Sequence, residues 1–296
     1  MPPSIHELSS QFAVHGLKFE AGNGGLLKAV IRTPLSQGEL YMQGAHVTNF
    51  QPEGQKPVLW MSEKSVFETG KPIRGGIPIC FPWFGPLASD PKAPGHGFAR
   101  TTLWSLISTQ ALSDGSVAIE LQSEINDFLV KLDVTFAQSL QLTLHVELKK
   151  TATQPATFEE ALHTYFTVSD VRQIAIAGLE ATGFVDKVDS AKVKPATGKS
   201  VLFDGECDRV YLDTTATCVL NDPGFRRTIE VAKKNSSSTV IWNPWIEKSS
   251  RMADFGDDEW PGMVCIETAN VGTNSIQVSP GQSHQMSVTI SAHHVV

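Results

Sequence analysis

The sequence predicts an all-β fold, a large antiparallel β-sandwich with few short helices. Apolar residues alternate with polar ones, turn residues recur at short intervals, and no long helical stripe is present. The clearest alternation covers residues 140–148, where Leu or Val fills every second position. Such a pattern is typical of a strand with one buried face and one polar face.

Other segments support the same fold class. Alternation recurs at residues 117–121, 130–136 and 286–290. Gly, Pro, Asn and Asp separate these runs, as expected for turns between strands. Only residues 62–69 and 247–255 suggest short helical turns. Because no linker, charge block or internal repeat divides the chain, we expect one domain over residues 1–296.

Composition excludes several classes of protein. The chain has 296 residues, a formal net charge of −7 and 41% hydrophobic residues, which is ordinary for a globular protein. The acidic balance argues against nucleic acid and anionic membranes as partners. Residues 1–10 lack the basic and apolar regions of a secretory signal, and no apolar run approaches the length of a membrane span. We therefore expect a cytoplasmic protein that is a monomer or a weak oligomer.

The motifs of common cofactor and metal sites are missing from the sequence. The four cysteines are far apart, at Cys80, Cys207, Cys218 and Cys265. Their spacing fits neither a zinc site nor a redox pair, so we expect reduced thiols. Residues 198–200 read Gly-Lys-Ser, but Val193 stands where a phosphate-binding loop needs glycine. Acidic residues 257–259 are more simply interpreted as a solvated loop than as a cation site.

The segment from residue 72 to residue 100 is rich in Gly, Pro and aromatic residues. Loops of this length in compact proteins are usually functional or disordered, and the aromatic residues favour an ordered one. Arg74 precedes two glycines, and Arg100 follows a second glycine-containing run. Glycine lets the backbone approach a ligand, and arginine binds phosphate or carboxylate with two donors. Together they suggest an oxyanion site, although ordinary surface ion pairs explain the spacing equally well.

Four polar residues elsewhere are further candidates. His163 and Glu267 interrupt apolar segments, and a buried carboxylate needs a partner or a function. A satisfied core histidine or a structural ion pair would also account for them. His96 lies between two glycines, which exposes its ring, and Asp208 precedes an arginine with which it could form a turn salt bridge.

Taken together, five motifs make a specific pattern. They occupy residues 74–78, 81–86, 96–100, 162–166 and 208–211, in that order. The chain resembles the D-hexose-6-phosphate mutarotases, also called glucose-6-phosphate 1-epimerases, of the aldose 1-epimerase superfamily. The resemblance extends from about Leu40 to about Ser279 and implies a galactose mutarotase-like β-sandwich.

The resemblance also implies an isomerase and a role for each matching residue. His163 matches the catalytic acid and Glu267 the catalytic base. Substrate-binding positions match Arg74, Arg100, Asp208, His96 and Gly95, the last of which has no side chain to offer. A histidine near its usual pKa of about 6.5 is suited to proton transfer at neutral pH.

The implied partner is a small sugar phosphate, with no metal and no organic cofactor. The implied reaction is interconversion of the α and β anomers of hexose 6-phosphates, most simply glucose 6-phosphate. Two alternatives stay open. An aldose 1-epimerase acting on unphosphorylated sugars would share the acid and base residues, and a non-catalytic carbohydrate-binding module would share only the fold.

Overall fold

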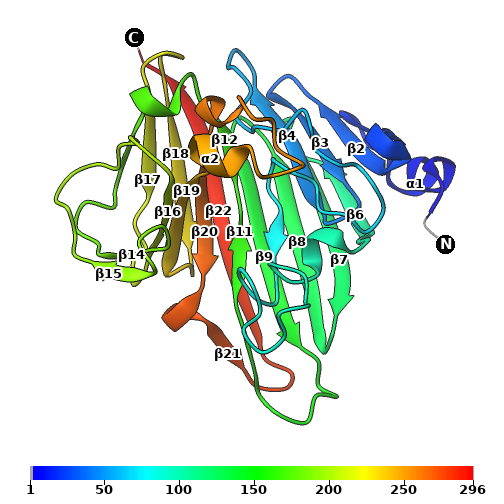
Figure 1. Ribbon diagram of the computed structural model, residues 1–296. Coiled ribbons are helices and arrows are strands. Elements are labelled where there is room, and N and C mark those ends of the chain that lie inside the picture. The colour runs from blue at the N-terminus through cyan, green and yellow to red at the C-terminus, as the bar shows by residue number, and fades with distance from the viewer. Residues whose placement is uncertain (1–2, 296) are drawn as a thin grey trace.

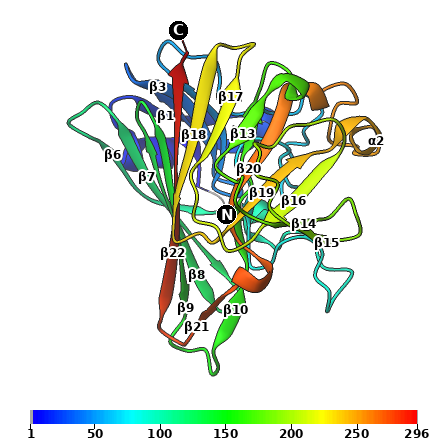
Figure 2. The same cartoon turned by 90° about the vertical axis from the view of Figure 1, so that its left-hand side faces the viewer.

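The computed structural model describes residues 3–295, most of which form antiparallel strands. Two eight-stranded sheets face each other, with β18 and β22 in one layer and β19 and β20 in the other (Figure 2). A four-stranded sheet at the N-terminal end and the short pair β10–β21 complete the architecture (Figure 1). The predicted antiparallel sandwich is confirmed.

The first large sheet has the order β13-β17-β18-β22-β9-β8-β7-β6. Its strands are β6 (Ser105–Ala111), β7 (Val117–Ile125), β8 (Phe128–Phe136), β9 (Leu140–Leu148), β13 (Ala175–Ala177), β17 (Cys218–Asp222), β18 (Arg227–Lys234) and β22 (Ser283–His294). Every second residue of β9 is buried, because that face packs into the sandwich. All four segments predicted from alternation lie in this sheet.

The second large sheet has the order β15-β14-β16-β19-β20-β11-β5, and β12 also pairs with β20. Its strands are β5 (Ile79–Cys80), β11 (Glu160–Leu162), β12 (Tyr165–Thr167), β14 (Phe184–Asp186), β15 (Lys192–Lys194), β16 (Cys207–Tyr211), β19 (Ser238–Asn243) and β20 (Met263–Asn270). Every residue of β19 and β20 is buried, so one face meets the core and loops cover the other.

The remaining elements are short. The small sheets contain β1 (Leu17–Ala21), β2 (Leu27–Arg32), β3 (Ser36–Tyr41), β4 (His46–Pro52), β10 (Ala156–Phe158) and β21 (Ile276–Val278). The two α-helices are α1 (Ile5–Phe12) and α2 (Trp245–Ser249). The short 3-10 turns are η1 (Asn23–Gly25), η2 (Ala99–Thr101), η3 (Val171–Gln173), η4 (Trp260–Gly262) and η5 (Gly272–Asn274).

The helical expectations are only partly correct. Helix α2 overlaps the beginning of the predicted turn at residues 247–255, but residues 62–69 form no helix. The side chain of Gln43 keeps that segment in an extended conformation, because its amide donates to the carbonyl oxygens of Glu68 and Lys71. Helix α1 was not predicted, although its capping box, in which Ser4 and Glu7 bind each other's backbone, is visible in the sequence.

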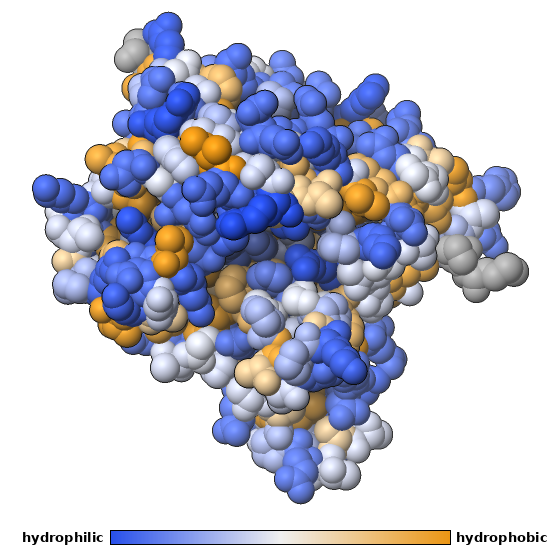
Figure 3. All heavy atoms as spheres, in the orientation of Figure 1, coloured by the Kyte–Doolittle hydropathy of each residue, from blue (hydrophilic) through white to orange (hydrophobic). Residues whose placement is uncertain are grey.

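Hydrophilic residues cover most of the face shown in Figure 3, which is hollowed near its centre. Apolar residues reach this surface only in small groups. Among residues 3–295, no helix has the length and apolar character needed to cross a membrane.

Buried His46 connects β4 to the loop that carries Arg74. Its Nε2 lies 2.7 Å from the carbonyl oxygen of Gly75, to which it donates in the neutral form. Burial lowers the pKa of His46 to about 4, although the hydrogen bond to Gly75 works in the opposite direction. His46 is therefore neutral in the folded protein at pH 7.

This histidine gives folding a pH dependence. In the unfolded chain His46 takes up a proton near pH 6.5, whereas in the folded protein it does so only near pH 4. The stability that comes from keeping His46 neutral is therefore complete above pH 6.5 and is lost as the pH falls toward 4. Between pH 7 and pH 5, urea unfolding should show a free-energy loss about 2 kcal/mol larger for the wild type than for His46→Gln. Equal losses in the two proteins would contradict the assignment.

Candidate active site

One cavity of about 390 Å³ collects most of the predicted site residues. It opens between the covered face of β16, β19 and β20 and the loops above, and its volume suits a small ligand. Its lining comprises Arg74, Phe84, Gly85, Pro86, His96, His163, Lys187, Asp208, Val240, Trp242, Lys248, Met252 and Glu267. Five of the seven residues expected from the sequence therefore meet here.

His163 and Glu267 lie side by side at the buried end of this cavity. Glu267 belongs to β20, and His163 lies in the break between β11 and β12. Nδ1 of His163 is 3.1 Å from Oε1 of Glu267, and the two side chains are 8% and 1% exposed. Among the described residues, neither that Nδ1 nor Oε2 of Glu267 has a hydrogen-bond partner. Unpaired buried polar atoms that line a cavity are available to a ligand.

Burial changes the protonation of this pair. It lowers the pKa of His163 well below its usual value, and the positive charges of Arg74 and Arg100 act in the same direction. It also raises the pKa of Glu267 well above the usual value, as does the nearby carboxylate of Asp208. The expectation that His163 titrates near pH 6.5 is therefore wrong, because a charged imidazole loses its hydration in this site.

Aromatic rings fix the orientation of His163. Its ring stacks on Tyr165, with centroids 4.8 Å apart and planes inclined by 16°. Trp242 meets it edge-on at 6.1 Å. These contacts leave the imidazole little freedom to rotate away from Glu267.

His96 enters the cavity from a strained turn. Its φ of 67° lies in the left-handed region, which non-glycine residues adopt at a cost. Nδ1 accepts a hydrogen bond from the backbone N–H of Gly85 at 3.2 Å. Burial, together with Arg100 and Arg74, lowers the pKa of His96 to about 3. The ring is therefore neutral and carries its proton on Nε2, so it can donate to a ligand oxygen.

Arg74 is held in place by two partners. Its Nε and Nη2 donate to the carboxylate of Asp254 at 3.1 and 3.3 Å, and its Nη1 donates to the hydroxyl of Tyr165 at 2.9 Å. A guanidinium has five N–H donors, so two remain for a ligand. Asp254 was not expected from the sequence.

Arg100 and Gly95, the two other expected residues, do not line the cavity. Nη2 of Arg100 donates to the carbonyl oxygen of Gly95 at 2.7 Å. The arginine is nevertheless close enough to act on the pKa of His96, His163 and Glu267. In this arrangement it contributes positive potential behind the cavity wall.

Asp208 in β16 forms part of another wall. Burial raises the pKa of its carboxyl group, whereas the nearby ammonium groups of Lys248 and Lys187 lower it. Lys248 donates to Glu206 at 2.8 Å and lies 3.7 Å from the carboxylate of Asp208. Neither lysine was expected from the sequence, where each is an isolated charge without a pattern.

Two glycines explain the path of the loop at Arg74. Gly75 and Gly76 have φ values of 112° and 60°, in the region that favours glycine. A Cβ on Gly76 would lie 2.3 Å from the carbonyl oxygen of Val47, and one on Gly75 would lie 2.5 Å from that of Trp60. The backbone can pass between β4 and the segment at Trp60 only without side chains, and this close fit sets where Arg74 emerges.

The acidic segment at residues 257–259 contains a structural anchor. The carboxylate of Glu259 accepts hydrogen bonds from the Ser62 hydroxyl at 2.8 Å and from the backbone N–H groups of Glu63 and Gly256, both at 2.7 Å. It joins the loop before the arginine to the loop that carries its aspartate partner. Among residues 3–295, no group of three or more His, Cys, Asp or Glu side chains is arranged to hold a metal ion.

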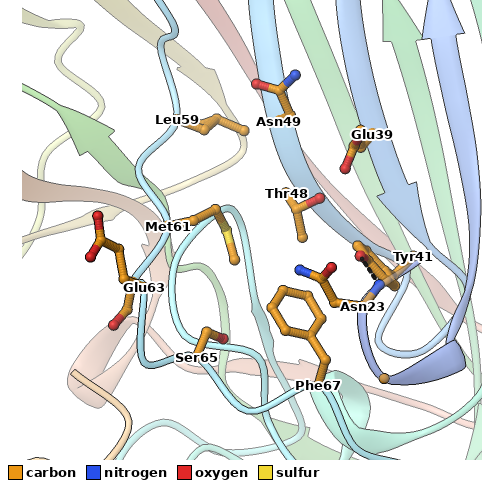
Figure 4. A pocket seen from close by; sticks show the side chains of 12 residues that line it. Asn23, Glu39, Tyr41, Thr48, Asn49, Leu59, Met61, Glu63, Ser65 and Phe67 are labelled. Carbon is orange, nitrogen blue, oxygen red and sulfur yellow. Dashed lines mark hydrogen bonds between the residues drawn. The ribbon is translucent and has the colours of Figure 1, made fainter. Parts of the chain in front are cut away.

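A larger hollow of about 670 Å³ lies beside the N-terminal sheet (Figure 4). Tyr41, Phe67 and Met61 border it, and none of the residues expected to act lines it. Its one carboxylate from β3, Glu39, is already bound to Lys28 at 2.8 Å. The buried acid–base pair makes the smaller cavity the better candidate for chemistry.

The family follows from comparison with known proteins. The family model described as aldose 1-epimerase matches residues 29–291. The chain belongs to the aldose 1-epimerase family. This membership confirms the resemblance seen in the motifs, and the enzyme is accordingly an isomerase.

Individual relatives of this epimerase are similar over most of their length. A protein of Escherichia coli (strain K12), provisionally named glucose-6-phosphate 1-epimerase, is 37% identical over 81% of this chain and 82% of its own. A protein of Cenchrus ciliaris with the same provisional name is 31% identical over 90% and 85%.

Solved structures agree with this fold. A crystal structure from Salmonella typhimurium, described provisionally as a mutarotase, matches with a TM-score of 0.88 and 30% identity, covering 96% of each chain. A second solved structure, HI1317, matches with a TM-score of 0.82 and 26% identity over 96% of this chain and 98% of its own. The similarity therefore includes the arrangement of the strands that position the cavity.

The close packing at Gly76 can be tested by substitution. Gly76→Ala adds a Cβ that collides with β4, whereas Gly54→Ala, at a φ of 73°, meets nothing within 4 Å. Urea unfolding should show a loss of about 1 kcal/mol for the Gly54 variant, from backbone strain alone. The Gly76 variant should lose about 2–4 kcal/mol, because strain and overpacking add. Similar losses in the two variants would contradict the packing argument.

Proposed function

We propose that this epimerase interconverts the α and β anomers of hexose 6-phosphates and that its main substrate is glucose 6-phosphate. The observation that carries the proposal is the buried pair at the end of the cavity, with His163 and Glu267 3.1 Å apart. Ring opening needs one group to remove a proton and another to deliver one. A pure binding module would gain nothing from burying two such groups without hydrogen bonds.

In the proposed mechanism, a carboxylate oxygen of Glu267 removes the proton from the C1 hydroxyl of the sugar. The C1–O5 bond breaks as its electron pair moves to O5, which takes a proton from His163. The resulting open-chain aldehyde turns about C1–C2 and closes from the other face while both residues reverse their roles. No atom is gained or lost, and the pair returns to its starting state.

The pair must share one proton for this cycle. Because burial lowers the pKa of His163 and raises that of Glu267, it favours the form in which the shared proton is on Glu267 and the imidazole is neutral. Across 3.1 Å it can pass to His163, which gives the carboxylate and imidazolium that the cycle needs. The active form is therefore one arrangement of a singly protonated pair.

The other cavity residues have positioning roles in this proposal. Asp208 accepts hydrogen bonds from sugar hydroxyl groups, and His96 donates from Nε2 to a sugar oxygen. Arg74 offers its two free N–H donors, and Arg100 adds positive potential from behind the wall. Gly95 takes part only through its carbonyl group, which holds Arg100. Holding the ring in one orientation lowers the entropic cost of reaction.

The phosphorylated substrate is supported by two observations. The similar proteins of E. coli and C. ciliaris carry the provisional name glucose-6-phosphate 1-epimerase. Arg74, Lys187 and Lys248 place three cationic side chains in the lining of a protein whose net charge is −7. Such a concentration of positive charge favours an anionic ligand.

The roles of the pair can be tested by anomer exchange on glucose 6-phosphate, measured by NMR saturation transfer. His163→Ala and Glu267→Gln should each lower kcat by about 10²–10⁴-fold, because each removes one proton-transfer group. His145→Ala is the matched control, since His145 lies on the outer face of β9, paired with Asp133. Near-normal turnover in either site variant, with the fold intact by circular dichroism, would reject the acid–base assignment.

The shared proton also predicts a pH profile that differs from that of an unperturbed pair. An unperturbed pair would hold one proton only between about pH 4.5 and pH 6.5. Because the pKa of His163 lies well below its usual value and that of Glu267 well above, these limits do not apply to the buried pair. We therefore expect kcat to show no fall centred at pH 6.5 between pH 6 and pH 7.5. A fall in kcat centred at pH 6.5 would show that the histidine is unshifted.

A further inference from the structure

We infer that the hollow of about 670 Å³ beside the N-terminal sheet is a second binding site and that its ligand is a neutral carbohydrate, such as a glycoside with two sugar rings. The site is separate from the cavity of His163 and Glu267, because the two share no lining residue. The inference concerns binding without a second reaction, and it does not rest on the proposed function.

Two walls enclose the hollow. One is the outer face of the small sheet, and the other is the segment from residue 59 to residue 67 (Figure 4). Glu39 and Tyr41 lie on the face of β3 that points away from the core. At one end, turn η1 approaches the opposite segment so closely that a Cβ on Gly24 would lie 1.7 Å from the carbonyl oxygen of Phe67. A ligand in the hollow would therefore be contacted from both sides.

The wall opposite the sheet is held in place by contacts outside the hollow. The hydroxyl of Ser62 donates to the carboxylate of Glu259 at 2.8 Å, and the hydroxyl of Ser65 accepts from the backbone N–H of Arg74 at 2.8 Å. The side chain of Gln43 holds the chain that follows this segment. The hollow is therefore formed without a ligand, which lowers the entropic cost of binding one.

The wall contributed by β4 carries a polar atom that the fold leaves unpaired. Thr48 is 4% exposed and lies in the lining (Figure 4). Its Oγ1 has no hydrogen-bond partner among residues 3–295. Burying an unpaired hydroxyl costs free energy, so packing alone gives no reason for threonine at this position. A ligand hydroxyl that reached Thr48 would supply the missing hydrogen bond.

The other lining residues combine an apolar surface with hydrogen-bonding groups. The rings of Tyr41 and Phe67 have centroids 5.3 Å apart and planes inclined by 41°, and Met61 borders the same space. Asn23 and Asn49 add side-chain amides, each of which can donate and accept. A sugar ring has an apolar C–H face and a rim of hydroxyl groups that donate and accept, so it matches both kinds of surface.

The charge of the lining favours an uncharged ligand. It contains the carboxyl groups of Glu39 and Glu63 and no cationic side chain, so a phosphate or another anion would be repelled. Lys28 already pairs with Glu39 at 2.8 Å, which weakens the attraction of the site for a cation. The volume of about 670 Å³ exceeds the 390 Å³ of the active-site cavity, which leaves room for more than one sugar ring.

Saturation-transfer-difference NMR on the full-length enzyme tests the inference. The probes are the methyl β-glycosides of maltose, cellobiose and lactose, which have no phosphate and no free C1 hydroxyl for the active-site cavity to act on. We expect at least one of them to bind with a dissociation constant below about 10 mM. Saturating glucose 6-phosphate should not displace it, because the two ligands occupy different sites.

Three variants locate the binding. Thr48→Val should raise the dissociation constant about three- to ten-fold, because one hydrogen bond to the ligand is lost. Its urea midpoint should not fall, since Oγ1 has no partner in the protein to lose. Phe67→Ala should weaken binding about ten-fold, because a ring that contacts the sugar is removed. Val66→Ala is the matched control, since its exposed side chain lies outside the lining, and it should bind like the wild type.

Three results would overturn the inference. The first is that none of the glycosides binds at about 20 mM, and binding of 1,4-diaminobutane in their place would assign the hollow to cations. The second is an unchanged dissociation constant in both Thr48→Val and Phe67→Ala. The third is displacement of the glycoside by glucose 6-phosphate, which would place the probe in the active-site cavity.

Discussion

The site depends on the burial of a carboxyl group and an imidazole next to each other in the middle of a β-sandwich. Ordinary core packing would not retain them, since each loses its hydration and neither gains a full hydrogen bond. Burial favours the form of the pair in which both groups are uncharged, with the shared proton on Glu267, and this lowers the cost of the arrangement. His163 and Glu267 are thus maintained against the preference of the surrounding core for apolar residues.

The loops above β19 and β20 have to be as well ordered as the strands for the cavity to keep its shape, because both line it. Glu259 supplies part of that order, because its carboxylate accepts three hydrogen bonds from two loops. Arg74 and Asp254 add a second connection between the same loops, and Gly76 fixes the backbone between them. A carboxylate of this kind resembles ordinary surface charge in a sequence, yet here it helps to place Arg74 in the wall of the cavity.

Some features of the molecule can be predicted from the sequence, and others cannot. Residues 140–148 show their strand directly, because burial on one face imposes a period of two. Five of the residues named from motifs meet in the cavity. Lys187, Asp254 and Glu259 were missed, since their roles arise from contacts with residues far away in the chain and leave no local pattern. The prediction of a helix at residues 62–69 was wrong for the same reason. The conformation of this segment depends on contacts with distant residues such as Gln43.

Strand β22 occupies the middle of its sheet, between β9 and β18, although it is the last strand along the chain. Until it inserts, both neighbours expose a row of unpaired backbone groups, and such edges readily join those of other molecules. The sandwich therefore has to close through contacts between distant parts of the chain, which is intrinsically slow. During synthesis, β9 and β18 each keep an open edge until β22 emerges, and this delay exposes the nascent sandwich to aggregation.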